Sequence, residues 1–356
     1  MNVSSQISPE VEAARQAGLV YVTDQKPGIS RLRTKTGFRY IDAGGKPVHD
    51  QETLARIKSL VIPPNWENVW ICSNPRGHLQ AVGRDFKGRK QYRYHPRYRA
   101  AREETKYNKM ALFGSLLPTI RKRVDHDLSL PGLPKEKVLA TVVRLMDLAH
   151  LRVGNEEYAR ENKSYGLTTM HDRHVRIEGS KLQFSFRGKS GIHHQIVLDS
   201  PRLASIVKRC RDLPGYELFQ YIDENGDHRA IESGMVNDYL REITGADITA
   251  KDFRTWHGTI SAAMELGKCG ACSSDAEIKR NIVAAIKVVS ERLGNRPATC
   301  RKYYVHPLLL ELYSKSMLTE QMVTVTTRET TQSLTPTEMC VLKLITDNTL
   351  NSPTST

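Results

Sequence analysis

The sequence predicts an α+β fold in two domains: a small N-terminal domain with an antiparallel β-sheet, and a mainly α C-terminal domain with a three-stranded β-meander. Three observations support this fold class. The chain has 356 residues, which is enough for two domains. Residues 18–95 are dominated by short alternating apolar runs with turn signals between them. Beyond Met110 the apolar spacing becomes helical and is interrupted by only three strand-like runs.

In the N-terminal part, residues 1–17 are interpreted as a lead-in and 18–105 as a β-rich domain. Hydrophobic alternation predicts strands at 19–22, 38–41, 69–72 and 79–82. The last two strands form a hairpin across the turn at 74–77, which has the sequence NPRG. A short helix over 52–60 is expected to end before Pro63 and Pro64, because proline interrupts a helix.

The segment 84–107 is strongly basic and carries the chain toward the second domain. It has nine Lys or Arg against three acidic residues. Five aromatic residues are interleaved with them: Phe86, Tyr92, Tyr94, Tyr98 and Tyr107. Cations neutralise phosphates, while tyrosines stack or hydrogen-bond, so this pattern favours contact with nucleic acid over an ordinary solvated face.

The C-terminal part, 106–320, is interpreted as a helical catalytic domain. Helical spacing predicts helices over 139–158, from about 202, over 249–266 and over 274–293, the third starting at a capping-box-like TAKD sequence and ending at Gly267. The meander is expected at 174–177, 182–186 and 192–198. Residues 321–356 are Thr- and Ser-rich, weakly helical around 338–345, and are interpreted as a polar tail appended to this domain.

The composition favours a polyanionic partner. Lys and Arg outnumber Asp and Glu by 53 to 39, a formal net charge of +14, which makes nucleic acid the first candidate and a ribosome-associated or simply basic protein the alternative. No apolar run is long enough for a membrane span, and the N-terminus has no secretory signal. Six scattered cysteines do not form a disulfide framework, so a cytoplasmic location is expected.

Motifs for cofactors and metals are weak. No GxxxxGK[ST] loop or strand-following GxGxxG is present, so neither an ATP-driven motor nor a dinucleotide enzyme is expected. Cys269 and Cys272 have ligand spacing, but no second pair follows, and two ordinary thiols are the preferred interpretation. Four histidines gather at the meander, where a DNA-facing surface is favoured over a metal site: His171, His174, His193 and His194. We therefore expect no cofactor and no metal.

The remaining polar constellation is cationic. It comprises five residues in short motifs: Arg152 in LRVGN, Lys189 in RGKSG, Arg254 in KDFRTW, Asn295 in LGNRP and Tyr304 in YYVHP. Each alone has a structural explanation, such as a salt-bridge partner, a solvated hairpin tip, a helix cap or a half-buried tyrosine.

Together and in this order, these motifs resemble those of the type IB DNA topoisomerases, specifically their poxvirus-like bacterial branch. The resemblance runs from about Gly18 to Lys315 and includes VIPPNW at 61–66 and GRKQYRYH at 88–95. RVGNEEYA at 152–159 and the run SYGLTT at 164–169 make chance similarity improbable. The resemblance implies a catalytic domain of the fold that these enzymes share with tyrosine recombinases.

What the resemblance implies for activity is relaxation of supercoiled double-stranded DNA, by transient cleavage of one strand and religation, without ATP or metal. It makes Tyr304, nine residues after Asn295, the nucleophile in place of Tyr303. Arg152 and Arg254 would bind the scissile phosphate. Asn295 would donate to a non-bridging oxygen, and Lys189 would be the general acid at the leaving oxygen.

Further residues are assigned by the same resemblance. Lys251, three residues before Arg254, would assist proton transfer. DNA contacts of the first domain are expected from six residues: Arg89, Lys90, Gln91, Tyr92, Arg93 and Tyr94. One departure is Asn295, which stands where poxvirus and eukaryotic members have His. An amide donates a hydrogen bond but contributes neither a proton nor a full charge, so the rate and pH dependence are affected.

Two alternatives stay open at this point. Tyrosine recombinases share the Arg, Lys, Arg, Tyr set, but usually have His where this chain has Lys251, and their first domain is normally helical. A non-catalytic architectural DNA-binding protein would leave Tyr304 structural. The favoured model is a monomeric, C-shaped clamp of two domains around duplex DNA in the bacterial nucleoid, with no membrane and no nucleotide cofactor.

Overall fold

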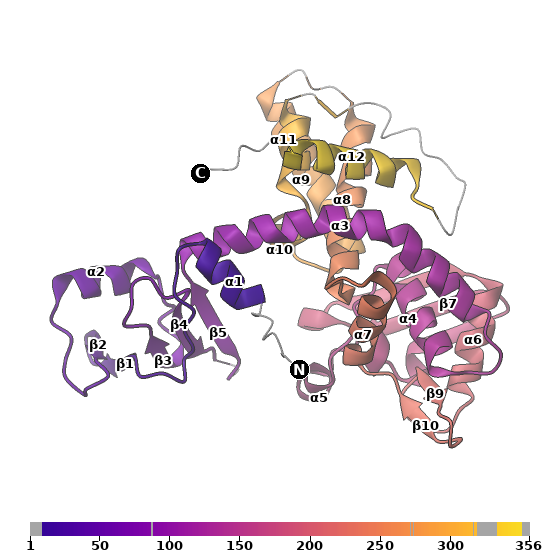
Figure 1. Cartoon of the computed structure of the whole chain (residues 1–356), viewed down its shortest axis with the longest axis horizontal. Coiled ribbons are helices and arrows are strands. Elements are labelled where there is room, and N and C mark those ends of the chain that lie inside the picture. The colour runs from indigo at the N-terminus through magenta and orange to yellow at the C-terminus, as the bar shows by residue number, and fades with distance from the viewer. Residues whose placement is uncertain are drawn as a thin grey trace, which may run out of the picture. The chain divides into compact units, whose positions relative to one another are not determined.

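The computed structural model describes residues 9–86, 88–270, 272, 274–315, 317–318 and 333–350. The chain divides into two compact units, Met1–Asn108 and Lys109–Thr356. The first unit carries an antiparallel sheet and the second is mostly helical with a small meander (Figure 1). The predicted α+β fold class is therefore confirmed. Parts of the predicted lead-in (1–8) and of the predicted tail (321–332 and 351–356) lie outside the described residues.

The first unit is built on a five-stranded antiparallel sheet of order β2-β1-β3-β4-β5. Its elements are α1 Pro9–Gln16, β1 Ile29–Thr34, β2 Gly37–Ile41, α2 Gln51–Ser59, β3 Glu67–Ile71, β4 Leu79–Arg84 and β5 Lys90–Tyr94. The predicted hairpin is the β3–β4 pair, with Ile71 opposite Ala81. Ile57 of α2 is buried with both of these residues, so the helix covers the sheet through its apolar side.

The strand predicted at 19–22 is wrong. Val20 forms only an isolated bridge with Gly77. Two residues later, the backbone N–H of Val22 donates to the imidazole Nδ1 of His78 at 3.1 Å. Tyr21 stacks on the same imidazole, with ring centroids 4.5 Å apart. A side chain thus replaces the next strand partner, and the ladder does not extend.

The basic segment 84–107 contains two elements that the sequence analysis did not separate. Its first part forms β5, which pairs with β4 at one edge of the sheet. The rest begins α3, Pro96–Leu128, which continues into the second unit. The alternation of β5 leaves Lys90, Tyr92 and Tyr94 exposed and the two residues between them half-buried.

The second unit contains the predicted meander and more helices than the sequence analysis anticipated. The meander strands are β6 Val175–Glu178, β7 Lys181–Arg187 and β8 His193–Asp199, with a second small pair, β9 Gln220–Ile222 and β10 His228–Ala230. The helices are α4 Lys135–Ala149, α5 Glu156–Asn162, α6 Pro201–Arg211, α7 Ser233–Thr244, α8 Ala250–Cys269, α9 Asp275–Arg292, α10 Pro297–Tyr303, α11 Pro307–Ser314 and α12 Pro336–Leu350. Single 3₁₀ turns lie at Leu167–Thr169, Asp172–His174 and Lys189–Gly191.

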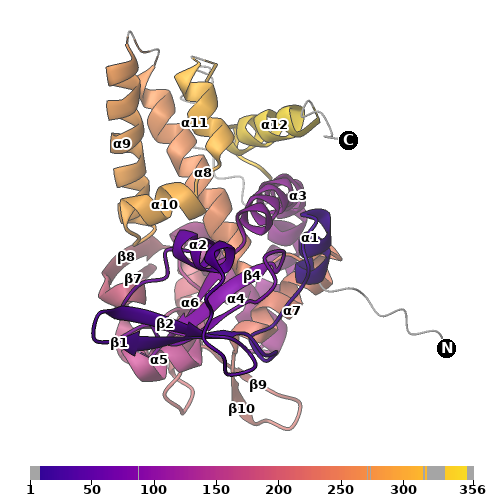
Figure 2. The same cartoon turned by 90° about the vertical axis from the view of Figure 1, so that its left-hand side faces the viewer.

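Helix α4 packs against α6, α7 and α8, and its buried face includes Val142, Val143 and Met146. The helices α8, α9 and α11 lie side by side (Figure 2). Trp256 on α8 is completely buried in the same core. No helix in the described part of the chain is long and apolar enough to cross a membrane.

Two helix ends differ from the predictions. The helix expected over 139–158 ends at Ala149, because His150 adopts a left-handed conformation with φ 55°, and a separate short helix begins at Glu156. Gly267 lies inside α8, and the helix ends at Cys269 with Gly270 as its cap. The predicted start is confirmed, since the backbone N–H of Thr249 donates to the carboxylate of Asp252 at 2.8 Å.

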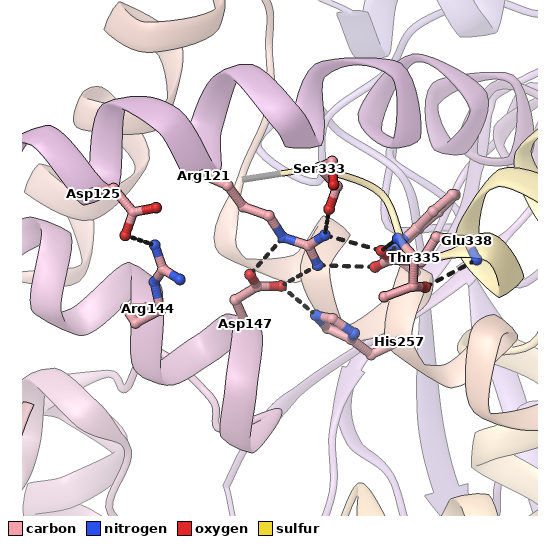
Figure 3. A network of polar contacts seen from close by, with 9 residues as sticks. Arg121, Asp125, Arg144, Asp147, His257, Ser333, Thr335 and Glu338 are labelled. Atoms are coloured by element: carbon pink, nitrogen blue, oxygen red, sulfur yellow. Dashed lines mark hydrogen bonds and ion pairs between the residues drawn. The ribbon is translucent and has the colours of Figure 1, made fainter. Parts of the chain in front are cut away.

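The described part of the predicted tail is not an appendage in the structure. Val341 and Ile345 of α12 belong to the main core. Glu338 is only 3% exposed and accepts hydrogen bonds from both terminal nitrogens of Arg121, each at 2.9 Å (Figure 3). Arg121 also donates to Asp147, whose carboxylate lies 3.1 Å from Nε2 of His257. This buried network joins α3, α4, α8 and α12 around one guanidinium.

Candidate active site

Arg254 is held in place by backbone carbonyls. It lies in the first turns of α8 and is 5% exposed. One terminal nitrogen donates to the carbonyl of His150 at 2.5 Å and the other to that of Leu293 at 2.6 Å. Both carbonyls belong to helix ends, where they have no partner within the helix. Its Nε is buried and has no hydrogen-bond partner among the described residues. The charge is therefore anchored at two points and keeps one donor available.

Arg152 lies in the loop that follows α4. The backbone of that loop is bonded to the SYGLTT segment, with Leu167 N donating to Arg152 O at 2.9 Å. A Cβ on Gly166 would lie 2.6 Å from the Cα of Gly154, so glycine is needed for this close approach. The two motifs that the sequence analysis singled out as most specific thus pack on each other and set the position of one arginine.

Asn295 is oriented by Arg152. The guanidinium donates to its Oδ1 at 2.5 Å. This bond identifies the remaining amide group as Nδ2, which is buried and has no partner among the described residues. A buried donor without a partner is costly, and in a binding site it indicates a missing acceptor. An anionic oxygen would satisfy it.

Tyr304 directly follows α10, and its ring lies against Arg254, with the guanidinium carbon 5.2 Å from the ring centroid. Its carbonyl accepts from the hydroxyl of Thr259 at 3.3 Å. Tyr303, in contrast, is 48% exposed, and its ring is accompanied by Lys302. Only the second tyrosine of the pair therefore faces the arginines.

The electrostatics of Tyr304 are dominated by two opposing effects. Burial by itself raises the pKa of the phenol, but the positive charges of Arg254 and Arg152 outweigh it, so that the net pKa lies below its ordinary value. Lys189 adds a smaller effect in the same direction. For Arg254, burial and the charge of Arg152 lower the pKa to about 10, which leaves it protonated at neutral pH.

Lys189 lies in the turn between β7 and β8, where it is exposed. Its ammonium lies 5.5 Å from the ring centroid of Tyr158 on α5. The next residue, Ser190, has φ 64°, so the hairpin tip is tightly turned. Lys189 is thus near enough to act on Tyr304 electrostatically, and it keeps an exposed ammonium.

Other predicted site residues lie elsewhere. Lys251 is exposed in the first turn of α8, and among the described residues its side chain has no hydrogen bond or ion pair with the five residues of the cationic constellation. Cys269 is exposed at the end of that helix, while Cys272 contacts the hydroxyl of Tyr313 at 2.9 Å. Among the described residues no group of three His, Cys, Asp or Glu side chains is arranged to hold a metal ion.

The histidine cluster was only partly understood from the sequence. His174 is buried against Tyr165, whereas His193 is exposed. His194 points inward, stacks on Phe186 with ring centroids 5.0 Å apart, and borders a small cavity that Arg152 and Arg254 also line. The alternation of β8 explains the difference between these neighbours, since successive side chains leave opposite faces of a strand. The preferred interpretation, a DNA-facing surface, does not apply to His194.

The predicted DNA contacts of the first unit divide into two sets. Arg89 pairs with Asp85 at 2.6 Å, Gln91 donates to the same carboxylate, and Arg93 donates to the carbonyl of Val61 at 2.8 Å. These three side chains have structural partners. The exposed face of β5 carries the others, Lys90, Tyr92 and Tyr94. Lys90 also pairs with Asp24 at 2.6 Å, and the two tyrosine rings lie 6.0 Å apart and nearly parallel.

The assembled site consists of a phenol with a lowered pKa, two anchored guanidinium groups, a buried amide donor without a partner and an exposed ammonium. Guanidinium and amide donors suit the oxygens of a phosphodiester, and a phenol beside them is a nucleophile for its phosphorus. The sequence did not reveal that the backbone carbonyls of His150 and Leu293 hold Arg254 in place. Every residue has a backbone carbonyl, so this role gives no signal in the sequence.

Comparison with known proteins supports the same chemistry. A model described as "Eukaryotic DNA topoisomerase I, catalytic core" matches residues 82–329, and one described as "Bacterial DNA topoisomerase IB, N-terminal domain" matches 37–85. The chain is 32% identical to a DNA topoisomerase 1B of Acanthamoeba polyphaga mimivirus, over 81% of this chain and 88% of that protein. It is 23% identical to the DNA topoisomerase 1B of Vaccinia virus (strain Copenhagen), over 69% and 76%. It is also 25% identical to a DNA topoisomerase 1 of Schizosaccharomyces pombe, over 65% of this chain and 25% of that protein.

Proposed function

Since the chain belongs to the type IB DNA topoisomerase family, we propose that it relaxes supercoiled duplex DNA by cutting one strand with Tyr304 and then rejoining it. The observation that carries this assignment of the nucleophile is the position of the Tyr304 ring, 5.2 Å from the guanidinium of Arg254, together with the lowered pKa of its phenol.

The cleavage step is a transesterification. The phenol of Tyr304 gives its proton to solvent water and its oxygen forms a bond to phosphorus. The bond from phosphorus to the 5′ oxygen breaks, and that oxygen takes a proton from Lys189. The products are a 3′-phosphotyrosyl link and a 5′ hydroxyl. Religation is the reverse step. Because one phosphoester replaces another, the bond energy is retained in the intermediate, and rotation of the free strand requires no ATP.

The cationic groups make this attack feasible. A phosphodiester is anionic, and its five-coordinate transition state carries more charge on the equatorial oxygens than the ground state. Arg152 and Arg254 offset that charge from fixed positions, so little reorganisation is needed. Asn295 would bring its unpartnered Nδ2 to one of the same oxygens, which would satisfy the donor at the moment when DNA binds.

Lys189 is proposed as the general acid at the departing 5′ oxygen, because its ammonium is exposed on a turn and close enough to influence Tyr304. We expect Lys189→Ala to slow cleavage by about 10²- to 10⁴-fold. A 5′-phosphorothiolate strand should restore the rate, since a thiolate leaves without a proton.

The matched control for this prediction is Lys181→Ala, which removes an exposed lysine from the start of the same strand pair. It should cleave both substrates as the unchanged protein does. Failure of the sulfur substrate to rescue Lys189→Ala would exclude Lys189 from proton donation.

For the first unit we propose that the exposed face of β5 contacts the DNA backbone through Lys90, Tyr92 and Tyr94. Its cation and its parallel rings suit phosphates and sugars. Arg89, Gln91 and Arg93 would shape that strand through their contacts within the unit. One active site suffices for a single-strand cut, so the protein would act as a monomer. The bacterial N-terminal domain match favours a bacterial protein acting on nucleoid DNA.

The first test is relaxation of negatively and of positively supercoiled plasmids with EDTA present and ATP absent. Relaxation of both is expected, because the proposed steps use only protein side chains. Intact DNA binding without relaxation would contradict the proposal. It would also revive the two alternatives from the sequence, a recombinase or an architectural binder, which the matches do not favour.

A further inference from the structure

His194 occupies the space between two catalytic loops. The edge of its imidazole lies between Gly188, which precedes Lys189, and Gly294, which precedes Asn295. A Cβ on Gly188 would lie 2.6 Å from Cδ2 of the ring, and a Cβ on Gly294 would lie 2.7 Å from Nε2. Such distances are shorter than real contacts of a Cβ, so each glycine is in direct contact with the ring.

The ring is fixed from its own strand as well. It stacks on Phe186 of β7, with an interplanar angle of 11°, and the register pairs the same two residues across the β7–β8 ladder. None of the hydrogen bonds found among the described residues involves its two nitrogens. The imidazole therefore acts on its surroundings through packing.

The charge state of the ring suits this position. Burial, followed by the charges of Arg152 and Arg254, lowers the pKa of His194 to about 4. At neutral pH the ring is uncharged, so it fills the space beside the two arginines without adding to their mutual repulsion. A lysine or arginine side chain in its place would carry a positive charge and would add to that repulsion.

We propose that His194 is a positioning residue that sets the spacing between the Lys189 turn and the Asn295 turn. The two turns come from different parts of the chain, since one joins β7 to β8 and the other joins α9 to α10. Both glycines touch the ring of His194, which therefore links the two turns. This inference rests on the roles proposed above for Lys189 and Asn295.

The first variant is His194→Ala, measured by single-turnover cleavage of a duplex under conditions where the variant is folded. Because a displacement of about 1 Å at a reacting group costs up to about 10²-fold in rate, we expect cleavage to slow by about 10- to 100-fold with DNA affinity unchanged. The control Val197→Ala removes an exposed side chain from the opposite face of β8 and should cleave normally.

A 5′-phosphorothiolate substrate separates positioning of Lys189 from a general structural effect. If the ring positions the proton donor, the rate difference between His194→Ala and the unchanged protein should narrow on the sulfur substrate. An equal difference on both substrates would overturn the assignment.

Gly188→Ala provides a second route that leaves His194 in place. Gly188 has φ −93°, which alanine adopts without strain, so the added methyl acts only by pushing the ring. We expect slower cleavage here too, and partial recovery in the Gly188→Ala, His194→Ala double variant, where the methyl enters the vacated space. Additive losses would contradict contact through the ring.

The failure of this inference is distinguishable from failure of the proposed function. If the unchanged protein cleaves DNA and His194→Ala cleaves it equally fast, only this inference fails. If the unchanged protein does not cleave DNA, the proposed function fails.

Discussion

Tyr304→Phe is expected to form no covalent adduct with DNA while binding duplex with its original affinity. The change removes a single oxygen, the proposed nucleophile, and leaves the ring against Arg254. The measurement is denaturant trapping on a duplex labelled at the 5′ end of the cleaved strand, because a 3′-phosphotyrosyl link keeps that label on the protein. Relaxation of plasmid should be lost in parallel.

The neighbouring tyrosine provides the control. Tyr303→Phe alters an exposed ring outside the arginine pair, so it should retain both adduct formation and relaxation. If Tyr304→Phe still formed the adduct, or if only Tyr303→Phe lost it, the nucleophile would be Tyr303.

Glu338→Ala is expected to destabilise the second unit by about 3 kcal/mol, because it removes a buried carboxylate and leaves the donors that it satisfied without that acceptor, although Arg121 keeps its pair with Asp147. Glu338 is 3% exposed and accepts from Arg121, from the indole N–H of Trp256 and from the backbone of Thr335. The free energy of unfolding in urea measures the loss. For a unit of this size, a change of this magnitude corresponds to roughly 10 °C in Tm.

The adjacent residue on α12 makes the comparison specific. Met339 is 51% exposed, so Met339→Ala should change stability by no more than about 0.5 kcal/mol. If Glu338→Ala were equally mild, α12 would be the appendage that its composition suggests. The helix α12 lies outside residues 82–329, the region that matches the catalytic-core family model. The family match therefore gives no information on the contacts of this helix.

Local signals in the sequence were sufficient where a contact lies within one element or between neighbours. The hairpin of β3 and β4, the three meander strands and the capping box at Thr249 all depend on residues close together in the chain. The alternation of β8 likewise separates His193 from His194 once the strand is recognised. These features follow from backbone periodicity, which a single sequence displays directly.

Long-range contacts overrode local signals elsewhere. Residues 19–22 have the composition of a strand, but the imidazole of His78 takes the next backbone bond. The helical pattern of 139–158 continues through His150, yet the chain turns there and presents a carbonyl to Arg254. The polar tail contains Glu338, whose burial depends on an arginine more than 200 positions earlier.

The sequence by itself determined the fold class, the set of five proposed catalytic residues and the family to which the chain belongs, because motif identity and order are properties of the chain alone. Only the tertiary structure decided what surrounds Tyr304, which histidine packs inside the site, and which residues of β5 remain exposed. The physical reason is that burial and electrostatic environment are set by neighbours distant in sequence: Tyr304 has a lowered pKa only because Arg152 and Arg254, from two other elements, lie beside it.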